Sequence, residues 1–299
     1  MVSNTYNRYL WLISTLLDNK KLSFKQLCDK WANSSFSDGV PLNKRTFHKH
    51  CEAVEQMFGV DIECNNSYQY FIKDNSVFNN DYVRRWLINS FNTSFAIKES
   101  KKINDRIVFE DIPSGTEFLK TIISSMVQNK ILSICYQTFY GDKPQTFTLR
   151  PYCLKQYRQR WYLLAFCNER NALRHYSLDR IKSMDITDSS FVYPDDFNPE
   201  TYYKNSIGIW VDDTLDPEIV VIRAYGEQVK YLRTLPLHSS QVEIFKCEGY
   251  SDFEYNICIT KVLEYELLRY GNSVEVLEPK KLRESMITNI KDMLNRYKN

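Results

Sequence analysis

The middle of the chain, residues 131–186, is a run of short β-strand patterns separated by tight turns. This run restricts the possible folds strongly, because closely spaced short strands favour a small, strongly bent β-barrel. The second strand pattern is followed by Pro151, which we expect to separate it from the third. The six expected strands are Ile131–Thr138, Thr146–Arg150, Tyr152–Gln156, Trp161–Phe166, Leu173–Leu178 and Ile181–Ile186.

Charge is distributed unevenly along the chain, although the formal net charge of the 299 residues is only +2. Residues 126–186 carry a net charge of +6, whereas residues 212–299 carry −3. A basic module attracts anionic partners. The content of 43% hydrophobic and 25% charged residues is ordinary for a globular protein, and the length allows two or three domains.

Three helical patterns occupy the N-terminal part of the chain. Apolar spacing predicts the first helix over residues 6–17. Ser23 and Gln26 form a capping box that opens the second helix, and Asn43 caps the third. The third helix should bury a stripe of four apolar side chains, which are Phe47, Cys51, Val54 and Phe58.

A β-hairpin pattern follows this third helix. The strands Val60–Cys64 and Tyr68–Ile72 flank the turn Asn65–Ser67, where asparagine tolerates the positive φ of a tight turn. Three helices followed by a hairpin form a winged helix-turn-helix. We predict this arrangement for residues 1–75.

The third helix of such a module enters the major groove of DNA, and its N-terminal residues reach base edges. We therefore predict a double-stranded DNA operator as a partner. A small helical domain for protein contacts remains an alternative, because the net charge of residues 1–75 is only +1. His48 and His50 should point to different sides of the helix, so we predict no metal shared between them. The expected DNA-contacting residues are Lys44, Arg45, Thr46, His48 and Lys49.

The connecting residues 76–126 are predicted to be mainly helical and to space the N-terminal module from the barrel. Ser90–Lys102 is polar and has no clear period, and Ile107–Phe109 is a short apolar patch before a turn at Pro113–Gly115. The residues that mark the two expected helices are Tyr82, Trp86 and Ile88 for the first, and Phe118, Ile122 and Met126 for the second.

The C-terminal residues 212–299 show the element order βαββαβ, which is the split βαβ arrangement. A final amphipathic helix over Leu282–Tyr297 should pack on its own domain or on a partner subunit, and we predict a homodimer. The chain as a whole is therefore an α+β multidomain protein. The expected strands are Glu218–Ala224, Gln241–Cys247, Phe253–Ile259 and Val274–Leu277, and the expected helices between them are Gly226–Leu235 and Lys261–Tyr270.

Four sequence pieces in the barrel region resemble the WYL-domain family of bacterial regulators. They are ICYQTFYG with Tyr136, the step Arg150-Pro151-Tyr152, Trp161-Tyr162-Leu163 within RWYLLAF, and LRHYSLDRI with Arg174, Tyr176, Asp179, Arg180 and Ile181. The four pieces occur in the family's order. With the modules on either side, the resemblance covers nearly the whole chain and sets the expected domains at 1–75, 76–126, 127–211 and 212–299.

The resemblance implies a ligand-responsive transcription factor with an Sm- or SH3-like WYL barrel and a C-terminal WCX-type extension. The barrel of such proteins is thought to sense a nucleotide or single-stranded nucleic acid, and the regulators often act as repressors in phage defence or DNA damage. Several family members have an arginine where this chain has Ser177, and this difference bears on ligand type or affinity. The implied ligand-binding residues are Tyr136, Arg150, Tyr162, Arg174 and Arg180, with His175 and Ser177 as neighbours.

Arginine and tyrosine suit such a ligand, because guanidinium pairs with phosphate and both side chains stack on bases. Strand alternation predicts that Trp161 and Leu163 face the core, with Tyr162 on the opposite side. Asp179 is expected to form a local ion pair with Arg180. The arginines of the turn YRQR, Arg158 and Arg160, are expected to be solvated or to contact phosphate.

Other functional classes have less support in the sequence. The chain has no dinucleotide-binding or P-loop glycine motif and no H-E-x-x-H, and none of its eight cysteines forms a C-x-x-C pair. We predict no metal, cofactor or membrane partner, and a cytoplasmic protein with reduced thiols. The alternatives are a nuclease or nucleotide hydrolase that uses the basic barrel, and an adaptor that binds partners through its C-terminal domain. The barrel's acidic residues form no paired metal-binding motif, so we predict that the protein is not an enzyme.

Overall fold

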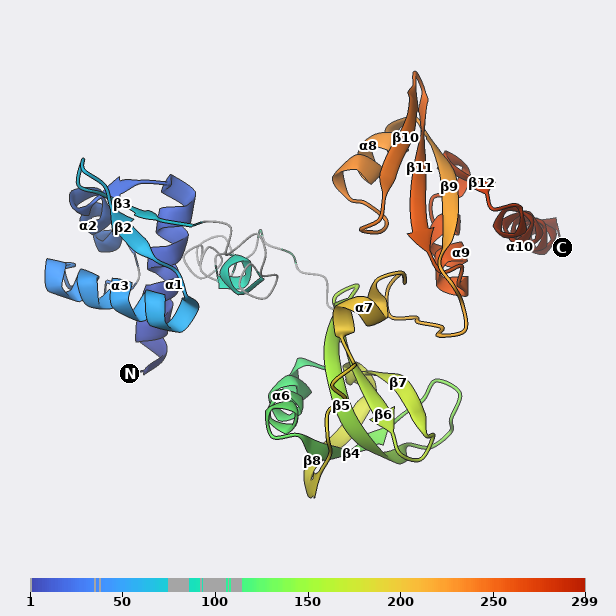
Figure 1. The fold of residues 1–299 in the computed structure, drawn as a ribbon, viewed down its shortest axis with the longest axis horizontal. Helices are drawn as coiled ribbons and strands as arrows, with labels where there is room; N and C mark the ends of the chain where they lie inside the picture. The colour runs from blue at the N-terminus through green and yellow to red at the C-terminus, as the bar shows by residue number, and fades with distance from the viewer. Residues whose placement is uncertain are drawn as a thin grey trace. The chain divides into compact units, whose positions relative to one another are not determined.

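The chain divides into two compact units, Met1–Glu110 and Asp111–Asn299. Among the described residues, the first unit has one hydrophobic core and the second has two. Within the part of the chain that is described, no helix has both the length and the apolar character needed to cross a membrane. The computed structural model (Figure 1) describes residues 2–34, 36–37, 39–74, 86–91, 93, 106, 108 and 115–298.

The first unit packs helices against a small antiparallel sheet. The sheet has the order β1-β3-β2, in which Leu22 pairs with Tyr70 and Ile62 pairs with Ile72. The short strand β1 is an addition to the predicted hairpin. Its elements are α1 (Val2–Asn19), β1 (Leu22–Ser23), α2 (Phe24–Ala32), α3 (Lys44–Phe58), β2 (Ile62–Cys64) and β3 (Gln69–Ile72).

Both predicted helix caps are confirmed. The backbone N–H of Gln26 donates to Ser23 Oγ at 3.3 Å, and the N–H of Ser23 donates to Gln26 Oε1 at 2.8 Å. The N–H of Thr46 donates to Asn43 Oδ1 at 2.8 Å. The predicted stripe on α3 faces the core, where Phe47 is fully buried. Each cap satisfies backbone donors that the first helical turn leaves without partners.

The predicted turn between β2 and β3 is wrong in one respect. The positive φ falls on Tyr68, at 56°, and not on an asparagine. Asn65 instead accepts hydrogen bonds at its Oδ1 from the backbone N–H groups of Ser67 and Gln69, at 3.0 and 2.9 Å. Because the Asn65 side chain closes the turn from one end, the left-handed residue is displaced to the far end.

The connecting region is described only in part. Residues 86–91 are helical, and Ile88 is buried with the core of the first unit. The expected helix start at Tyr82, most of Ser90–Lys102, and the positions Ile107, Phe109, Pro113 and Ser114 lie outside the described residues. The second expected helix is present as α6 (Leu119–Val127), preceded by the 3₁₀ turn η2 (Thr116–Phe118).

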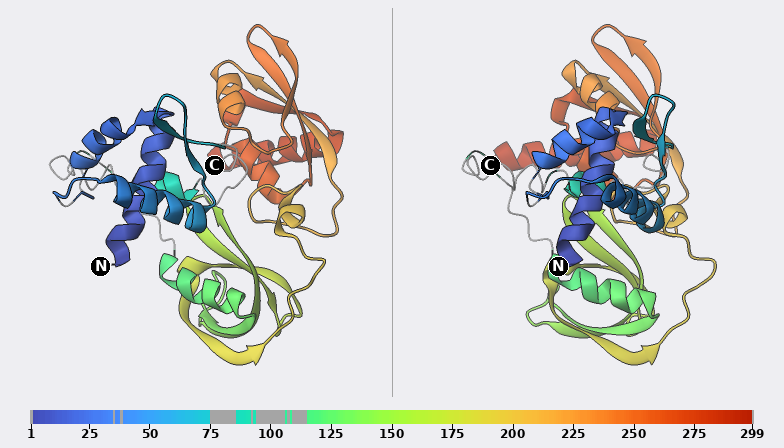
Figure 2. Two further views of the ribbon diagram at one scale, coloured as in Figure 1. Left: turned by 60° about the vertical axis from the view of Figure 1, so that its left-hand side comes forward. Right: turned by 90° about the vertical axis from the view of Figure 1, so that its left-hand side faces the viewer.

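A five-stranded antiparallel sheet follows α6, with the order β7-β6-β5-β4-β8. Figure 2 shows the sheet curling around, with α6 beside it. Ile122 of α6 is fully buried in the same core as Leu132, Ile134 and Leu163. The strands are β4 (Lys130–Tyr136), β5 (Gln145–Tyr157), β6 (Arg160–Cys167), β7 (Ala172–Ser177) and β8 (Ile181–Ser190), with the 3₁₀ turn η3 (Leu178–Arg180) before β8.

The prediction of two strands separated at Pro151 is wrong, because β5 runs through this residue. Pro151 pairs with Ala165, and Cys153 pairs with the next residue back, Leu164, so Tyr152 is an extra residue. This is a β-bulge, one of the few places where a strand tolerates proline. The bulge also exchanges the faces of the strand: Leu149 belongs to the core before it and Leu154 packs against the core after it.

The C-terminal part has the predicted βαββαβ order, and its sheet is arranged β10-β11-β9-β12 with antiparallel pairing throughout. This strand order is that of the split βαβ motif. The elements are α7 (Pro199–Tyr203), β9 (Glu218–Tyr225), α8 (Glu227–Thr234), β10 (Val242–Cys247), β11 (Tyr250–Ile257), α9 (Lys261–Leu268), β12 (Val274–Glu278) and α10 (Lys280–Lys298).

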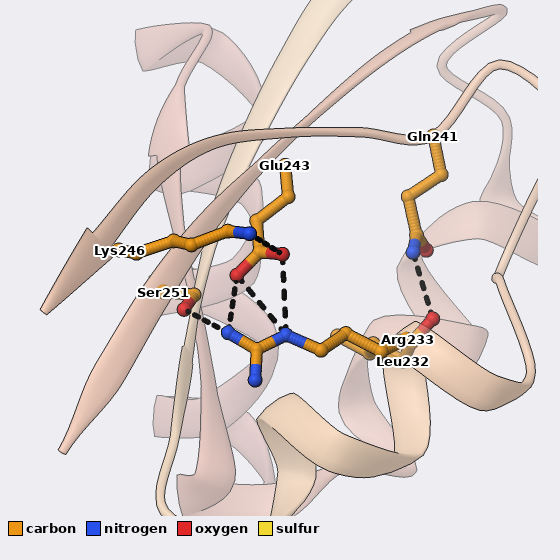
Figure 3. A network of polar contacts seen from close by, with 6 residues as sticks. All are labelled: Leu232, Arg233, Gln241, Glu243, Lys246 and Ser251. Atoms are coloured by element: carbon orange, nitrogen blue, oxygen red, sulfur yellow. Dashed lines mark hydrogen bonds and ion pairs between the residues drawn. The ribbon is translucent and has the colours of Figure 1, made fainter. Parts of the chain in front are cut away.

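A polar network ties α8 to the edge strand β10 (Figure 3). Arg233 Nη2 and Nε donate to Glu243 at 2.6 to 3.2 Å, and Arg233 also reaches Ser251 Oγ at 3.3 Å. The hydrogen bonds from Arg233 lower the pKa of Glu243 to about 2. Gln241 Nε2 donates to the carbonyl of Leu232 at 2.7 Å and so closes the end of the helix.

Candidate functional site

The predicted DNA-contacting residues lie together on the first two turns of α3. Lys44, Arg45, His48 and Lys49 are exposed, and Thr46 is half-buried. Among the described residues, no acidic side chain pairs with Lys44, Arg45 or Lys49. These cations are therefore available to an external anion.

The two histidines of α3 have different environments. His48 is exposed and touches the edge of the Tyr70 ring, whereas His50 is buried against Tyr9 and Trp31. Burial lowers the pKa of His50, with a smaller contribution from Arg8. Within the described ranges, no group of three or more potential ligands could hold a metal ion.

The turn between β2 and β3 carries an exposed residue that the sequence prediction missed. Tyr68 is 82% exposed at the tip of this hairpin. An aromatic residue next to a predicted Asn-rich turn was the available signal. Its hydroxyl and ring give the hairpin a polar, planar tip.

A cavity of about 480 Å³ lies at one end of the five-stranded sheet and brings four predicted ligand residues together. Tyr136, Arg174, His175 and Arg180 all line it, whereas Arg150, Tyr162 and Ser177 do not. Its remaining lining residues, which are Thr138, Phe139, Tyr140, Arg170, Tyr176 and Trp210, include no acidic side chain.

Arg180 is the most distinctive group in the cavity. Its guanidinium carbon lies 5.0 Å from the centre of the Tyr136 ring and 4.2 Å from the centre of the Phe139 ring. Its Nε is buried and makes no hydrogen bond within the described part of the chain. A buried donor without a partner is costly, so it favours a ligand that can accept a hydrogen bond there.

The expected ion pair between Asp179 and Arg180 does not form. Asp179 instead accepts from Arg160 Nη1 at 3.4 Å and from the Ser177 hydroxyl. The 3₁₀ turn η3 separates the directions of the two neighbouring side chains. Arg160 therefore forms an ion pair and is not only solvated. The positive charge of Arg180 faces the cavity instead of Asp179.

Ser177 does not line the cavity. Its contacts are with neighbouring residues of the fold. It is fully buried, and its backbone N–H donates to the Tyr136 hydroxyl at 3.1 Å. This bond fixes the Tyr136 ring that lies beside Arg180. Burial raises the pKa of Tyr136, so its hydroxyl is neutral at pH 7.

Arg150 and Tyr162 lie on the sheet face opposite the core. The Arg150 guanidinium is 5.1 Å from the centre of the Phe166 ring, and its Nε is buried without a partner among the described residues. Tyr162 pairs in register with Lys155 and with Ser177. The predicted alternation of β6 holds, since Leu163 is fully buried in the core and Trp161 packs against it.

The sequence prediction missed six cavity residues, of which four have side chains that suit the proposed ligand. Phe139 and Trp210 are 75% and 59% exposed, and Tyr140 is fully exposed. Arg170 lies 4.9 Å from the centre of the Phe147 ring. Two aromatic residues directly before Gly141 were a usable signal, but Trp210 comes from a segment distant in the sequence.

His175 lines the cavity and forms a hydrogen bond with a residue outside the cavity wall. Its Nε2 lies 2.7 Å from the Tyr203 hydroxyl on α7. Burial and, to a smaller extent, the nearby Lys155 cation lower the pKa of His175 to about 4. The imidazole is therefore neutral at pH 7, so the positive charge of the cavity comes from Arg170, Arg174 and Arg180.

The comparisons with known proteins agree with this architecture. The WYL domain family matches residues 117–186, and the WCX domain family matches residues 216–294. A WYL domain followed by a WCX domain characterises one class of regulator. The chain therefore contains a WYL domain followed by a WCX domain, and the resemblance seen in its motifs is confirmed.

A comparison with solved structures gives matches that include two at low sequence identity. One is the proteasome accessory factor B/C (PafBC) of Arthrobacter aurescens, at 19% identity and a TM-score of 0.38, covering 95% of this chain and 46% of that one. The other is described as a CRISPR Cas-related protein, at 12% identity and a TM-score of 0.39, covering 86% of this chain and 74% of that one. This chain thus spans about half the length of the first structure. A search of curated protein sequences gives no match.

Proposed function

We propose that the protein is a ligand-responsive, DNA-binding transcriptional regulator and not an enzyme. In this proposal the first unit is a winged helix-turn-helix that binds a double-stranded operator through α3. The sheet of β4–β8 is an Sm-like WYL barrel, and its cavity binds a nucleotide or a single-stranded nucleic acid. The protein would act in the cytoplasm.

The observation that carries the proposal is the composition of the cavity. Three arginines and several aromatic rings line about 480 Å³, and no acidic side chain faces it. Guanidinium groups bind phosphate, and exposed rings stack on bases without requiring one sequence. Divalent-metal hydrolysis needs carboxylate ligands, which this wall lacks, so binding is favoured over turnover.

The direct test is fluorescence anisotropy on the duplex upstream of the protein's own gene, with and without an added octathymidylate. We expect sequence-selective binding that the oligonucleotide changes. Arg180→Ala should remove the response to the oligonucleotide and leave operator binding intact. An oligonucleotide that binds but leaves operator affinity unchanged would refute ligand sensing, because coupling requires different ligand affinities in the DNA-bound and free states.

The proposal includes repression, and a process in which single strands accumulate, such as phage defence or the response to DNA damage. A reporter placed under the same upstream sequence tests the sign of regulation. Deletion of the regulator should raise expression, and DNA damage should reproduce that rise in the native strain. Lower expression on deletion would identify an activator.

We also propose a homodimer formed through α10. Ile287, Ile290, Met293 and Leu294 on this helix are about half exposed, and the first three border an apolar groove with α9 and β12. Apolar residues grouped on one helix are typical of a protein interface. Light scattering should give a dimer for the native chain and a monomer for Ile290→Glu. A native monomer would contradict the proposal.

A further inference from the structure

The segment Pro199–Trp210 connects the cavity wall to the C-terminal core. It begins with α7, whose Tyr203 lies against β5 and β7. It ends with Trp210, which lines the cavity together with His175. Between them, Ile207 is 5% exposed and belongs to the core of the C-terminal sheet and helices. Twelve consecutive residues therefore contact the ligand cavity, the barrel exterior and the C-terminal core.

On the barrel side, Tyr203 is held from two directions. Its hydroxyl bonds to His175 Nε2 at 2.7 Å, and Lys155 Nζ lies 3.6 Å from the centre of its ring. Cation–π contacts of this kind gain strength when they are partly desolvated. Since His175 is itself part of the cavity wall, the position of Tyr203 fixes the position of a wall residue.

On the C-terminal side, the same segment is attached by its backbone. The N–H of Cys258, which follows β11, donates to the carbonyl of Asn205 at 2.8 Å. Gly208 has a φ of 70°, and a Cβ atom there would lie 2.8 Å from Cζ of Tyr157. Tyr157 in turn donates from its hydroxyl to Glu266 of α9 at 2.9 Å, and Arg158 forms an ion pair with the same carboxylate.

We propose that the segment Pro199–Trp210 transmits occupancy of the cavity to the C-terminal domain, with Tyr203 as the positioning residue that holds His175 in the cavity wall. The proposal rests on the proposed function, because it requires a ligand in the cavity. A ligand that contacts His175 and Trp210 reaches the segment directly at Trp210 and through His175 at Tyr203. Such a ligand restricts the motion of the segment's backbone. Because the middle of the segment is hydrogen-bonded to the C-terminal core, this restriction also orders residues of the C-terminal domain.

The first arm of the test needs no ligand. Tyr203→Phe removes the hydroxyl and keeps the ring over Lys155, and Tyr202→Phe is the matched control on the same helix. Hydrogen exchange should be about three- to ten-fold faster at the Cys258 amide in Tyr203→Phe and unchanged in Tyr202→Phe. Exchange at Ile134, in the central part of β4, should be the same in both variants. His175→Leu provides a second variant that removes the same contact, and it should speed exchange at the Cys258 amide in the same way.

The second arm uses fluorescein-labelled octathymidylate as the probe. Saturating probe should slow exchange at the Cys258 amide several-fold in the native chain. Tyr203→Phe should still bind the probe, with affinity reduced about three- to ten-fold, but should lose most of this protection. Arg180→Ala should not bind.

The outcomes separate the two proposals. If the probe binds the native chain and depends on Arg180 but leaves exchange at Cys258 unchanged, the transmission proposal is overturned and the cavity assignment stands. Equal exchange in Tyr203→Phe and Tyr202→Phe also overturns it. If the native chain does not bind the probe, the cavity assignment fails, and the transmission proposal fails with it.

Discussion

The exposed cations of α3 give a quantitative expectation for DNA binding. Arg45 and Lys49 are exposed and have no acidic partner among the described residues, so the double variant Arg45→Ala/Lys49→Ala should change the free energy of unfolding by no more than about 0.5 kcal/mol. Each phosphate contact contributes about 0.9 to the slope of log affinity against log salt. Losing two contacts should make this slope shallower by about 1.8. Between 50 and 200 mM salt, the native protein should therefore lose about 12-fold more affinity than the variant.

The assay is fluorescence anisotropy over a salt series on the upstream duplex. The control is Lys281→Ala/Lys291→Ala, which removes the same charge from exposed positions of α10. This control should keep the native slope, because in the proposed function α10 makes no phosphate contact with the operator. An unchanged slope in the α3 variant, or an equal reduction in the α10 variant, would show that α3 does not contact phosphate.

Three further expectations concern stability. Leu163 is fully buried in the core beneath the five-stranded sheet, so Leu163→Ala should cost about 2–5 kcal/mol in urea unfolding, and a smaller loss would mean that the core collapses around the cavity. Glu243→Gln breaks the pair with Arg233. Because the folded pKa of Glu243 is about 2 against an ordinary 4.5, the stability difference from the native chain should be full above pH 4.5 and should vanish as the pH falls towards 2. Gly115 has a φ of 64°, and a Cβ there would lie 2.3 Å from the backbone carbon of Leu178, so Gly115→Ala should lower the melting temperature by several degrees; no change would show that this approach can relax.

Local signals in the sequence predicted much of the fold. The caps at Ser23 and Asn43 act within one helical turn, so short-range spacing identifies them. The alternation around Leu163 depends only on the two-residue period of a strand. The proline in β5 misled the strand prediction, because the bulge that accommodates it depends on pairing with a distant strand. The secondary-structure propensity of a residue does not reveal which strands pair.

The cavity was only partly predictable for the same reason. Tyr136 and Arg180 belong to one motif-bearing region, and both line the cavity. Arg150 belongs to that region too, but the strand places it on the other face, over Phe166. Trp210 reaches the cavity from a segment outside the motifs, so only the folded chain brings it there. The bond between His175 and Tyr203 likewise joins residues 28 positions apart.

The bulge at Tyr152 decides which residues of β5 face the core and which face α7. Before it, β5 presents Leu149 to the interior; after it, the same strand presents Leu154 inward and Lys155 to α7. One extra residue shifts the alternation of side chains along the strand, so odd-numbered positions face the core before the bulge and even-numbered positions face it afterwards. Pairing that absorbed Tyr152 into a regular ladder would turn the second half of β5 inside out, placing Lys155 on the core face and Leu154 towards Tyr203, whereas deleting Tyr152 would keep the observed pairs. The bulge, and not the side chain of Tyr152, therefore sets which face each later residue of β5 presents.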